Sequence, residues 1–316
     1  MSAKPPVLCV MGPTASGKTE LAVNLVRRLP CEIVSVDSAM VYRGMDIGTA
    51  KPDRALLREA PHRLIDICDP AQAYSAARFR ADALREMELI RAAGRLPVLV
   101  GGTMLYFRAL EQGLSQLPSA DPRVREALDE EARKVGWAAL HARLARVDPQ
   151  AAGRIHPNDP QRIQRALEVH QITGRPLTEW FARRGPVEPP FRFIKLIVAP
   201  GDRALLHRRI AARFQTMLSR GFADEVRRLR ERGDLHQGLP SMRAVGYRQV
   251  WDYLDGKLGR DAMVERAVTA TRQYAKRQLT WLRAETGGTW YDALDPRLTD
   301  KVLKRLDRLV DLSDSN

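Results

Sequence analysis

The 316-residue sequence contains few cysteines and no long apolar run, and each shortage argues against a class of protein. Its three cysteines, Cys9, Cys31 and Cys68, are widely spaced, which supports neither a disulfide framework nor a CxxC-type zinc site. No apolar run approaches the ~20 residues that span a bilayer, and we expect neither a membrane span nor a signal peptide. The six histidines form no H-E-x-x-H pattern, which disfavours zinc hydrolysis. We therefore expect a cytoplasmic protein.

Lysine is also scarce, yet positive charge is in excess. Lys plus Arg amount to 52 residues against 38 acidic ones, which gives a formal net charge of +14, and only nine of the 52 are lysine. Residues 1–118 carry a net +3 and the remainder +11. An excess confined to the second part predicts a polyanionic partner such as nucleic acid. A GC-rich coding bias would explain arginine over lysine, but not bases over acids.

The first third of the chain alternates short β-branched runs with helical periodicity. Buried parallel strands are predicted over 7–11, 32–36, 63–67 and 97–100, with helices over 18–29 and 76–93. This alternation predicts an α/β fold with a parallel sheet.

The pattern changes to helix alone from about residue 120 to 185, where Asp159 and Gly174 mark the ends of one helix. A further strand is predicted over 193–199, and amphipathic helices are predicted over 202–232, 243–254 and 260–285. A strand that resumes after a helical block indicates an insertion. We predict a P-loop α/β core with C-terminal helices, formed by residues 1–118 and 190–316, and a helical insertion domain over residues 119–189.

A glycine-rich segment follows the first predicted strand and opens the first predicted helix. It matches G-x-x-x-x-G-K-[ST] and comprises Gly12, Pro13, Thr14, Ala15, Ser16, Gly17, Lys18 and Thr19. Such glycines let backbone N–H groups turn towards phosphate oxygens, and the helix N-terminus adds its dipole. We expect Lys18 to neutralise phosphate charge and the Thr19 hydroxyl to bind Mg²⁺.

The sequence lacks the aspartate that P-loop nucleotidases place after a later strand, since the strand over 97–100 runs into a glycine turn that ends in Thr103. Asp66 and Asp69 are weaker alternatives. Asp37 ends the second predicted strand, and ligands of parallel sheets bind beyond the carboxyl ends of the strands. Asp37 and Thr103 should therefore lie beside the phosphate loop. The Asp37 carboxylate could bind metal, accept a proton, or simply cap the segment that follows.

Six segments form a joint pattern far more specific than the phosphate loop alone. They are Gly12–Thr19, Asp37–Tyr42, Asp46–Pro52, Gly101–Tyr106, Ile155–Arg165 and Arg243–Arg248. The pattern, which extends to about residue 283, resembles the bacterial tRNA dimethylallyltransferases of the IPP transferase family. One departure is Ala244, where some members have cysteine.

The resemblance implies transfer of a dimethylallyl group from its diphosphate to N6 of adenosine 37 in tRNAs that read codons starting with U. It also implies a nucleoside-triphosphate-hydrolase-like core with a helical insertion. The phosphate loop would hold the leaving diphosphate, with Lys18 and Mg²⁺ offsetting its charge and with Thr19 and Asp37 as metal ligands. Asp37 would be the general base, and Thr103 would contact the adenosine or the diphosphate. Arg213 is either a second phosphate clamp or an ordinary surface arginine.

The tRNA would be the polyanionic partner of a monomeric enzyme, and its acceptor base would leave the anticodon-loop stack to react. The residues that the resemblance assigns to tRNA contact are Asp37, Ser38, Ala39, Met40, Thr103, Arg125, Gln161, Arg162, Ile163, Gln164, Arg165, Arg243, Ala244, Val245, Gly246, Tyr247, Arg248, Lys276, Arg277 and Arg283. As bare patterns, these amphipathic segments would more often be ordinary helix surface.

Two other functions stay open at this point. One is a small-molecule kinase or an adenylate isopentenyltransferase on the same core, although a free nucleotide acceptor needs neither the insertion nor the basic second part. The other is an RNA-binding P-loop regulator without catalysis, for which ATP should compete better than dimethylallyl diphosphate.

Overall fold

A parallel sheet of six strands forms the centre of the fold. The computed structural model describes residues 4–115, 117–183 and 188–309, and within them the strand order is β3-β2-β4-β1-β5-β6, with every pairing parallel. The strands are β1 (Pro6–Met11), β2 (Cys31–Val36), β3 (His62–Arg63), β4 (Leu96–Gly101), β5 (Arg192–Ala199) and β6 (Thr289–Asp292). The predicted P-loop-like α/β class is confirmed.

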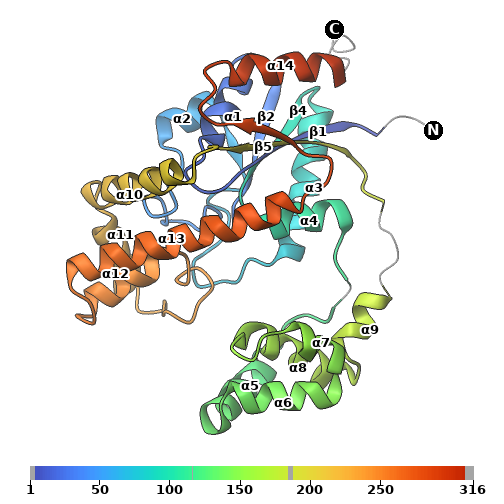
Figure 1. The fold of residues 1–316 in the computed structure, drawn as a ribbon, viewed down its shortest axis with the longest axis vertical. Helices are drawn as coiled ribbons and strands as arrows, with labels where there is room; N and C mark the ends of the chain where they lie inside the picture. Colours follow the sequence, from blue (N-terminus) through green and yellow to red (C-terminus); the bar gives the residue numbers. More distant parts are fainter. Residues whose placement is uncertain (1–3, 116, 184–187, 310–316) are drawn as a thin grey trace. The chain divides into compact units, whose positions relative to one another are not determined.

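Both faces of the sheet are covered by helices, which is why its strands read as continuous apolar runs rather than alternating ones. Along β1, Val7 and Cys9 point to one apolar cluster, while Leu8 and Val10 point to the other. The first cluster includes side chains of α3 (Ala76–Ala92), α4 (Met104–Gln112) and α13 (Arg260–Arg283). The second includes side chains of α1 (Lys18–Val26) and α14 (Leu298–Leu309), which Figure 1 shows together at one side of the sheet.

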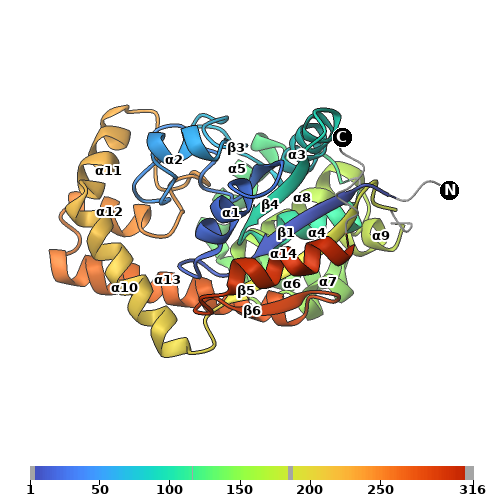
Figure 2. The ribbon, with the colours of Figure 1, turned by 90° about the horizontal axis from the view of Figure 1, so that it is seen from above.

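Four further helices of the core follow the connections of the sheet. They are α2 (Arg54–Glu59), α10 (Arg203–Ser219), α11 (Phe222–Glu231) and α12 (Tyr247–Leu254). Figure 2 shows α10 to α13 gathered beyond the end of the sheet towards which β1 runs. This is the edge where the carboxyl ends of the strands and their loops provide ligand sites in open α/β sheets.

Two predicted elements differ markedly in the structure, and one strand was not predicted. The strand predicted over 63–67 ends at Arg63, because Leu64 and Asp66 adopt left-handed backbone conformations with φ of 61° and 56°. The helix predicted over 202–232 is two helices, which part at Gly221 with φ of 88°. The last strand, β6, was not predicted; it is only four residues long and gains its order from pairing with β5.

The chain divides into two compact units, Met1–Glu111 with Pro189–Asn316, and Gln112–Glu188. Residues 1–3 and 310–316 of the predicted core lie outside the described residues. The second unit contains α5 (Pro122–Val135), α6 (Trp137–Val147), α7 (Pro149–Arg154), α8 (Pro160–Thr173) and α9 (Leu177–Ala182) around its own apolar core. Asp159 caps α8 by accepting a hydrogen bond from the N–H of Arg162, and Gly174 ends the helix at φ of 69°, as predicted.

None of the helices in the described part of the chain is long and apolar enough to cross a membrane.

Candidate active site

The phosphate loop joins β1 to α1 in a conformation that requires its small residues. A Cβ at Gly12 would lie 2.3 Å from the carbonyl oxygen of Val198 and 2.7 Å from Ser16 Oγ. Ala15 and Gly17 both have left-handed backbones, with φ of 62° and 92°. This winding turns the chain back on itself ahead of α1, whose first N–H groups have no partner within the helix. The loop is therefore a built anion site.

Two cations, Lys18 and Arg213, line this site, and neither forms an ion pair with a carboxylate among the residues that the structure describes. The Lys18 ammonium donates a hydrogen bond to the carbonyl oxygen of Pro13 at 3.1 Å. Burial and the nearby Arg213 lower the pKa of Lys18 to about 8, against a weaker opposing effect of Asp37. Burial likewise lowers the pKa of Arg213, with Asp37 opposing it. An anionic ligand between the two cations would relieve this mutual repulsion.

Asp37 follows β2 and holds its own turn in place. Its Oδ1 accepts hydrogen bonds from the N–H groups of Ala39 at 2.8 Å and Met40 at 3.2 Å. The capping role considered from the sequence is thus present, and it uses one carboxylate oxygen. Because Asp37 is only half-buried and lines the same cavity as Lys18, its carboxylate also faces the ligand site.

Thr103 lies on the turn after β4, next to the Asp37 segment. Its Oγ1 accepts a hydrogen bond from the N–H of Ser38 at 3.1 Å, and its own N–H donates to Val36 at 3.3 Å. The hydroxyl of Tyr274 is hydrogen-bonded to Thr103, and burial together with Asp37 raises the pKa of Tyr274. Thr103 thus connects the Asp37 turn to α13. Its side chain is not among those that line the cavity.

Beside the phosphate loop and the Asp37 turn, the third wall of the site is α13, for which only basic residues were predicted to have a role. Gln278 is 5% exposed; its Oε1 accepts from the N–H of Thr14 at 2.9 Å and its Nε2 donates to the Gly102 oxygen at 2.8 Å. Tyr274 lies one turn earlier on the same face of the helix. A glutamine between the apolar residues Ala275 and Leu282 was the available signal for this face.

These walls enclose a cavity of about 400 Å³. Many of the predicted site residues line it: Thr14, Ala15, Lys18, Thr19, Asp37, Ser38, Ala39, Met40, Arg213, Arg243, Ala244, Val245, Gly246, Tyr247 and Arg277. Apolar side chains of Ile210, Phe214, Met217 and Phe222 line it as well. The cavity thus combines cations, one carboxylate and an apolar surface.

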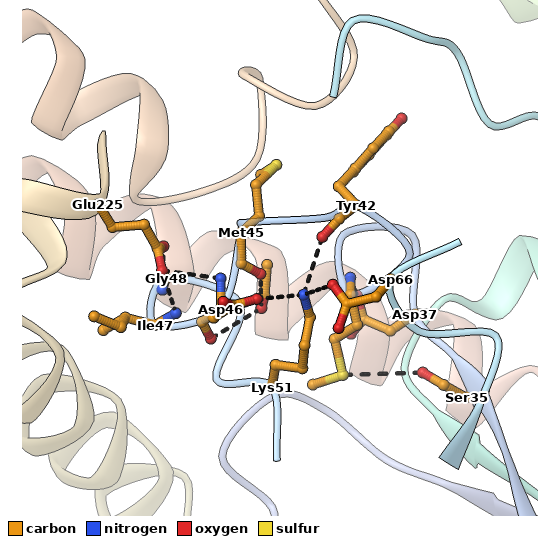
Figure 3. A network of polar contacts seen from close by, with 12 residues as sticks. Ser35, Asp37, Tyr42, Met45, Asp46, Ile47, Gly48, Lys51, Asp66 and Glu225 are labelled. Atoms are coloured by element: carbon orange, nitrogen blue, oxygen red, sulfur yellow. Dashed lines mark hydrogen bonds and ion pairs between the residues drawn. The ribbon is translucent and has the colours of Figure 1, made fainter. Parts of the chain in front are cut away.

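A loop from Met45 to Lys51, which we call the wall loop, is held at both ends by buried charges (Figure 3). The buried Glu225 carboxylate accepts from the N–H groups of Asp46 at 2.9 Å, Ile47 at 2.7 Å and Gly48 at 3.1 Å. At the other end Lys51 Nζ, whose side chain is 3% exposed, contacts Asp46 at 2.5 Å and Asp66 at 2.6 Å.

The wall loop also reaches the predicted phosphate clamp. Arg213 Nη2 donates a hydrogen bond to the Thr49 carbonyl oxygen at 3.4 Å. Gly48 is required within the loop, because a Cβ there would lie 2.1 Å from the ring of Phe222. Neither Glu225 nor Lys51 was predicted from the sequence to have a role in the site. Nothing in a single sequence links Glu225 to a loop about 180 residues earlier.

The remaining predicted tRNA residues of the core lie on exposed surface outside the cavity. Arg248 belongs to α12, and Lys276 and Arg283 belong to α13. Arg277 and Arg243 are exposed as well and line the cavity. These arginines and lysines therefore form accessible positive charge around the site.

In the helical insertion, several predicted tRNA residues serve the unit's own structure. Glu168, which is fully buried, makes a two-pronged ion pair with Arg125 at 2.8 and 3.1 Å and a second pair with Arg165 at 2.7 Å. Gln164 donates to Asp129 at 2.8 Å. Ile163 is fully buried in the apolar core, so its side chain is not placed to touch RNA.

Gln161 and Arg162 remain as exposed residues of the same helix segment. Arg162 lies 3.4 Å from Asp159 in an exposed ion pair, which constrains it only weakly.

The described residues contain no group of three or more His, Cys, Asp or Glu side chains that could hold a metal ion by themselves. Thr19 and Asp37, the two predicted Mg²⁺ ligands, do line the same cavity. The three cysteines are free and buried, so the structure contains no disulfide among them.

Fold and site together define a P-loop α/β protein whose loop faces a carboxylate across a partly apolar cavity. A family model described as IPP transferase matches residues 40–285. The chain therefore belongs to the IPP transferase family.

Individual relatives agree with this assignment. The tRNA dimethylallyltransferases of Alkalilimnicola ehrlichii and Thioalkalivibrio sulfidiphilus are 65% and 62% identical to it, over 90% of this chain and 90% and 88% of theirs. The crystal structure of a Bacillus halodurans tRNA isopentenylpyrophosphate transferase is 36% identical, with a TM-score of 0.71 over 99% of this chain and 98% of that one. A eukaryotic dimethylallyltransferase acting on tRNA, 26% identical, has a TM-score of 0.78 over 96% of this chain and 78% of its own.

Proposed function

We propose that the protein is a tRNA dimethylallyltransferase, which moves the dimethylallyl group from dimethylallyl diphosphate to N6 of adenosine 37 beside the anticodon. Its substrates are tRNAs that read codons starting with U. The observation that carries the proposal is the shared cavity, in which the phosphate loop with Lys18 and Arg213 faces Asp37 and an apolar surface. The names of the similar proteins support the same reaction.

The donor half of the site suits a leaving diphosphate. As the allylic C–O bond breaks, negative charge grows on the diphosphate, and Lys18 and Arg213 are placed to stabilise it. The apolar side chains of Phe214 and Met217 line the same cavity and offer a surface for the five-carbon prenyl group. No hydrolytic water needs positioning, which agrees with the lack of a carboxylate after β4.

The acceptor half is the Asp37 turn. The adenine N6 is a weak nucleophile because its lone pair is delocalised into the ring, so a base at hydrogen-bond distance assists the attack. The new N–C bond forms as the C–O bond breaks, and the N6 proton passes to the Asp37 carboxylate. Thr103 and Tyr274 hold the Asp37 segment in place through Ser38. We assign Thr103 a positioning role; the substrate contact predicted for it stays a prediction, since its side chain is not among those that line the cavity.

The residues present fit a Mg²⁺ ion. Ser16 Oγ is a fully buried hydroxyl with no hydrogen-bond partner among the described residues, so a ligand or water oxygen at the loop would satisfy it. We propose that Thr19 would hold the ion directly and that Asp37 would hold it through the ion's water shell, so that the free oxygen of the carboxylate stays able to accept the N6 proton. When bound, Mg²⁺ supplies charge that stabilises the leaving diphosphate.

The tRNA surface of the proposal comprises the exposed basic residues around the cavity and the exposed part of α8. Arg243, Arg277 and Lys276 offer charge to phosphates near the site, and Arg162 does so in the insertion. Arg125 and Arg165 retain outward-facing area beside their ion pairs and stay within the proposal. A tRNA substrate supports a cytoplasmic location, and since one chain builds the whole cavity, we propose a monomer.

The test is mass analysis of total tRNA incubated with the protein, Mg²⁺ and dimethylallyl diphosphate. We expect the mass of one five-carbon unit to be added to adenosine in anticodon loops. The same incubation with free AMP distinguishes an adenylate isopentenyltransferase. Competition by ATP that exceeds competition by the prenyl donor, without any product, would favour the non-catalytic regulator.

A further inference from the structure

The side chain of Gln278 connects the two glycine turns of the site. Its amide oxygen accepts the N–H of Thr14 at 2.9 Å, and its amide nitrogen donates to the oxygen of Gly102 at 2.8 Å. The fit is tight, because a Cβ at Gly102 would lie 2.2 Å from Gln278 Nε2. The amide therefore fills the space between the start of the phosphate loop and the turn after β4.

This position has a consequence for the donors of the loop. Phosphate loops bind their ligand through inward-facing backbone N–H groups, and each such group can satisfy one phosphate oxygen. Thr14 lines the cavity at the entry of the loop, yet its N–H is already occupied by the Gln278 oxygen. The donors left for a ligand lie towards the other end, at the first turn of α1 and at Lys18.

A diphosphate and a triphosphate differ in how much of the loop they need. A third phosphate group adds three more oxygens. These would extend along the loop beyond the N–H groups that bind the first two phosphates. At the Thr14 end it would meet the Gln278 side chain, which is buried and hydrogen-bonded on both sides. A bound triphosphate would then have to displace this amide and leave Gly102 without its partner, at an energetic cost.

We propose that Gln278 makes the phosphate loop select a diphosphate over a triphosphate, by occupying the Thr14 N–H and the space beside Gly102. The inference rests on the proposed function, since it concerns how the loop recognises the prenyl donor's diphosphate. It explains how a loop with the nucleotide-binding sequence pattern avoids the triphosphates that are its commonest ligands.

The experiment uses direct calorimetric binding of two probes, inorganic pyrophosphate and inorganic tripolyphosphate, to the full chain in excess Mg²⁺. Gln278→Ala frees the Thr14 N–H and opens the space. Gln278→Glu keeps an oxygen acceptor for that N–H but adds negative charge. Gln273→Ala is the matched control, because Gln273 is an exposed glutamine on the same helix.

In the wild type we expect pyrophosphate to bind at least as tightly as tripolyphosphate, despite its lower charge. Gln278→Ala should raise the affinity for tripolyphosphate about tenfold, which is the size of one hydrogen bond to a charged group, and should change pyrophosphate affinity by less than about threefold. Gln278→Glu should weaken both probes without favouring tripolyphosphate, and Gln273→Ala should match the wild type.

The inference would be overturned if Gln278→Ala changed the affinity for both probes equally, or did not raise the affinity for tripolyphosphate. The proposed function would still stand in either case, provided that the wild type binds pyrophosphate. Pyrophosphate binding by the variant also shows that it is folded. Failure of the wild type to bind pyrophosphate at all would instead remove the proposed function and this inference with it.

Discussion

The active-site cavity and the core of the helical insertion both enclose charged side chains, and they treat that charge in opposite ways. In the insertion, the buried Glu168 carboxylate is paired with both Arg125 and Arg165. In the cavity, Lys18 and Arg213 are two desolvated cations; burial lowers the pKa of both, and Arg213 lowers that of Lys18 further. Paired charge of the first kind destabilises a fold when one partner is removed, whereas like charge of the second kind is held ready for an anionic ligand. Perturbed groups in a cavity thus mark function more reliably than arginines on a helix.

The largest expected effect is on catalysis by Asp37. Asp37→Asn keeps an oxygen that accepts the N–H groups of Ala39 and Met40, so the turn should fold, but the amide cannot accept the N6 proton. We expect kcat for tRNA prenylation to fall about 10³-fold, within the range of general-base contributions. Single-turnover assays with saturating substrates measure this. An Asp37→Asn variant with near wild-type kcat would remove the base assignment.

The second effect concerns the paired charge of the insertion. Glu168→Gln removes the negative charge that holds Arg125 and Arg165, and because these arginines stay partly exposed to water we expect it to destabilise the insertion by about 2 kcal/mol. Urea unfolding combined with hydrogen exchange should localise the loss to residues 117–183. Exposed Glu126→Gln, in the same unit, is the matched control. A uniform loss across α5 to α9 and the parallel sheet would contradict this assignment.

Glu168 also gives the insertion a pH dependence. Burial raises the pKa of its carboxyl, but the ion pairs with Arg125 and Arg165 outweigh this and leave the pKa below its usual 4.5. The stabilisation is therefore complete above pH 4.5 and is lost as the pH falls through the lowered native pKa. In Glu168→Gln this acid-induced part of the loss should be absent.

Removing one of the two like charges of the cavity should stabilise the protein, whereas Glu168→Gln should destabilise it. Lys18→Met removes a desolvated cation, so the free protein should become more stable by about 1 kcal/mol, as is common when a strained functional site is relieved. The variant should also lose the stabilisation that pyrophosphate gives the wild type. Thermal melting with and without pyrophosphate and Mg²⁺ tests both statements. Lower stability of the unliganded variant would show that Lys18 is structural.

The smallest effect is the pH dependence of the difference in stability between the wild type and Lys18→Met. The pKa of Lys18 is about 8 in the folded chain and near 10.5 when unfolded, so the unfolded state binds more protons between these values. The stability of the wild type should therefore rise relative to Lys18→Met as the pH increases from 8 to 10.5. Over the same range pyrophosphate affinity should fall as Lys18 loses its charge. A constant stability difference between the two proteins would contradict the shifted pKa.

Much of this site was predictable because its first two walls are local in the sequence. The phosphate loop and Asp37 each follow a buried strand directly, and the rule that ligands lie beyond the carboxyl ends of parallel strands placed them together. The joint pattern of six segments predicted the family, and the match to the IPP transferase model confirmed it. The strand predicted over 63–67 was wrong because apolar composition does not reveal the left-handed conformations of Leu64 and Asp66.

The third wall was not predictable, because its contacts join residues far apart in the chain. Gln278 meets Thr14 across 264 residues, and a buried glutamine on an amphipathic helix has many alternative partners. The same holds for Glu225 and the wall loop. Conversely, Arg165 has the sequence appearance of an RNA contact, and only the structure shows its bond to Glu168.

The anchoring of the wall loop by Glu225 bears on the order in which the pocket is completed. During synthesis, the segment that contains Asp46, Ile47 and Gly48 leaves the ribosome long before α11 exists to accept its N–H groups. A nascent chain that ends before residue 222 has the phosphate loop and Asp37, but neither the carboxylate that fixes the wall loop nor the helix that carries Gln278. We therefore expect the polypeptide to acquire substrate binding late, when its last third folds back onto its first.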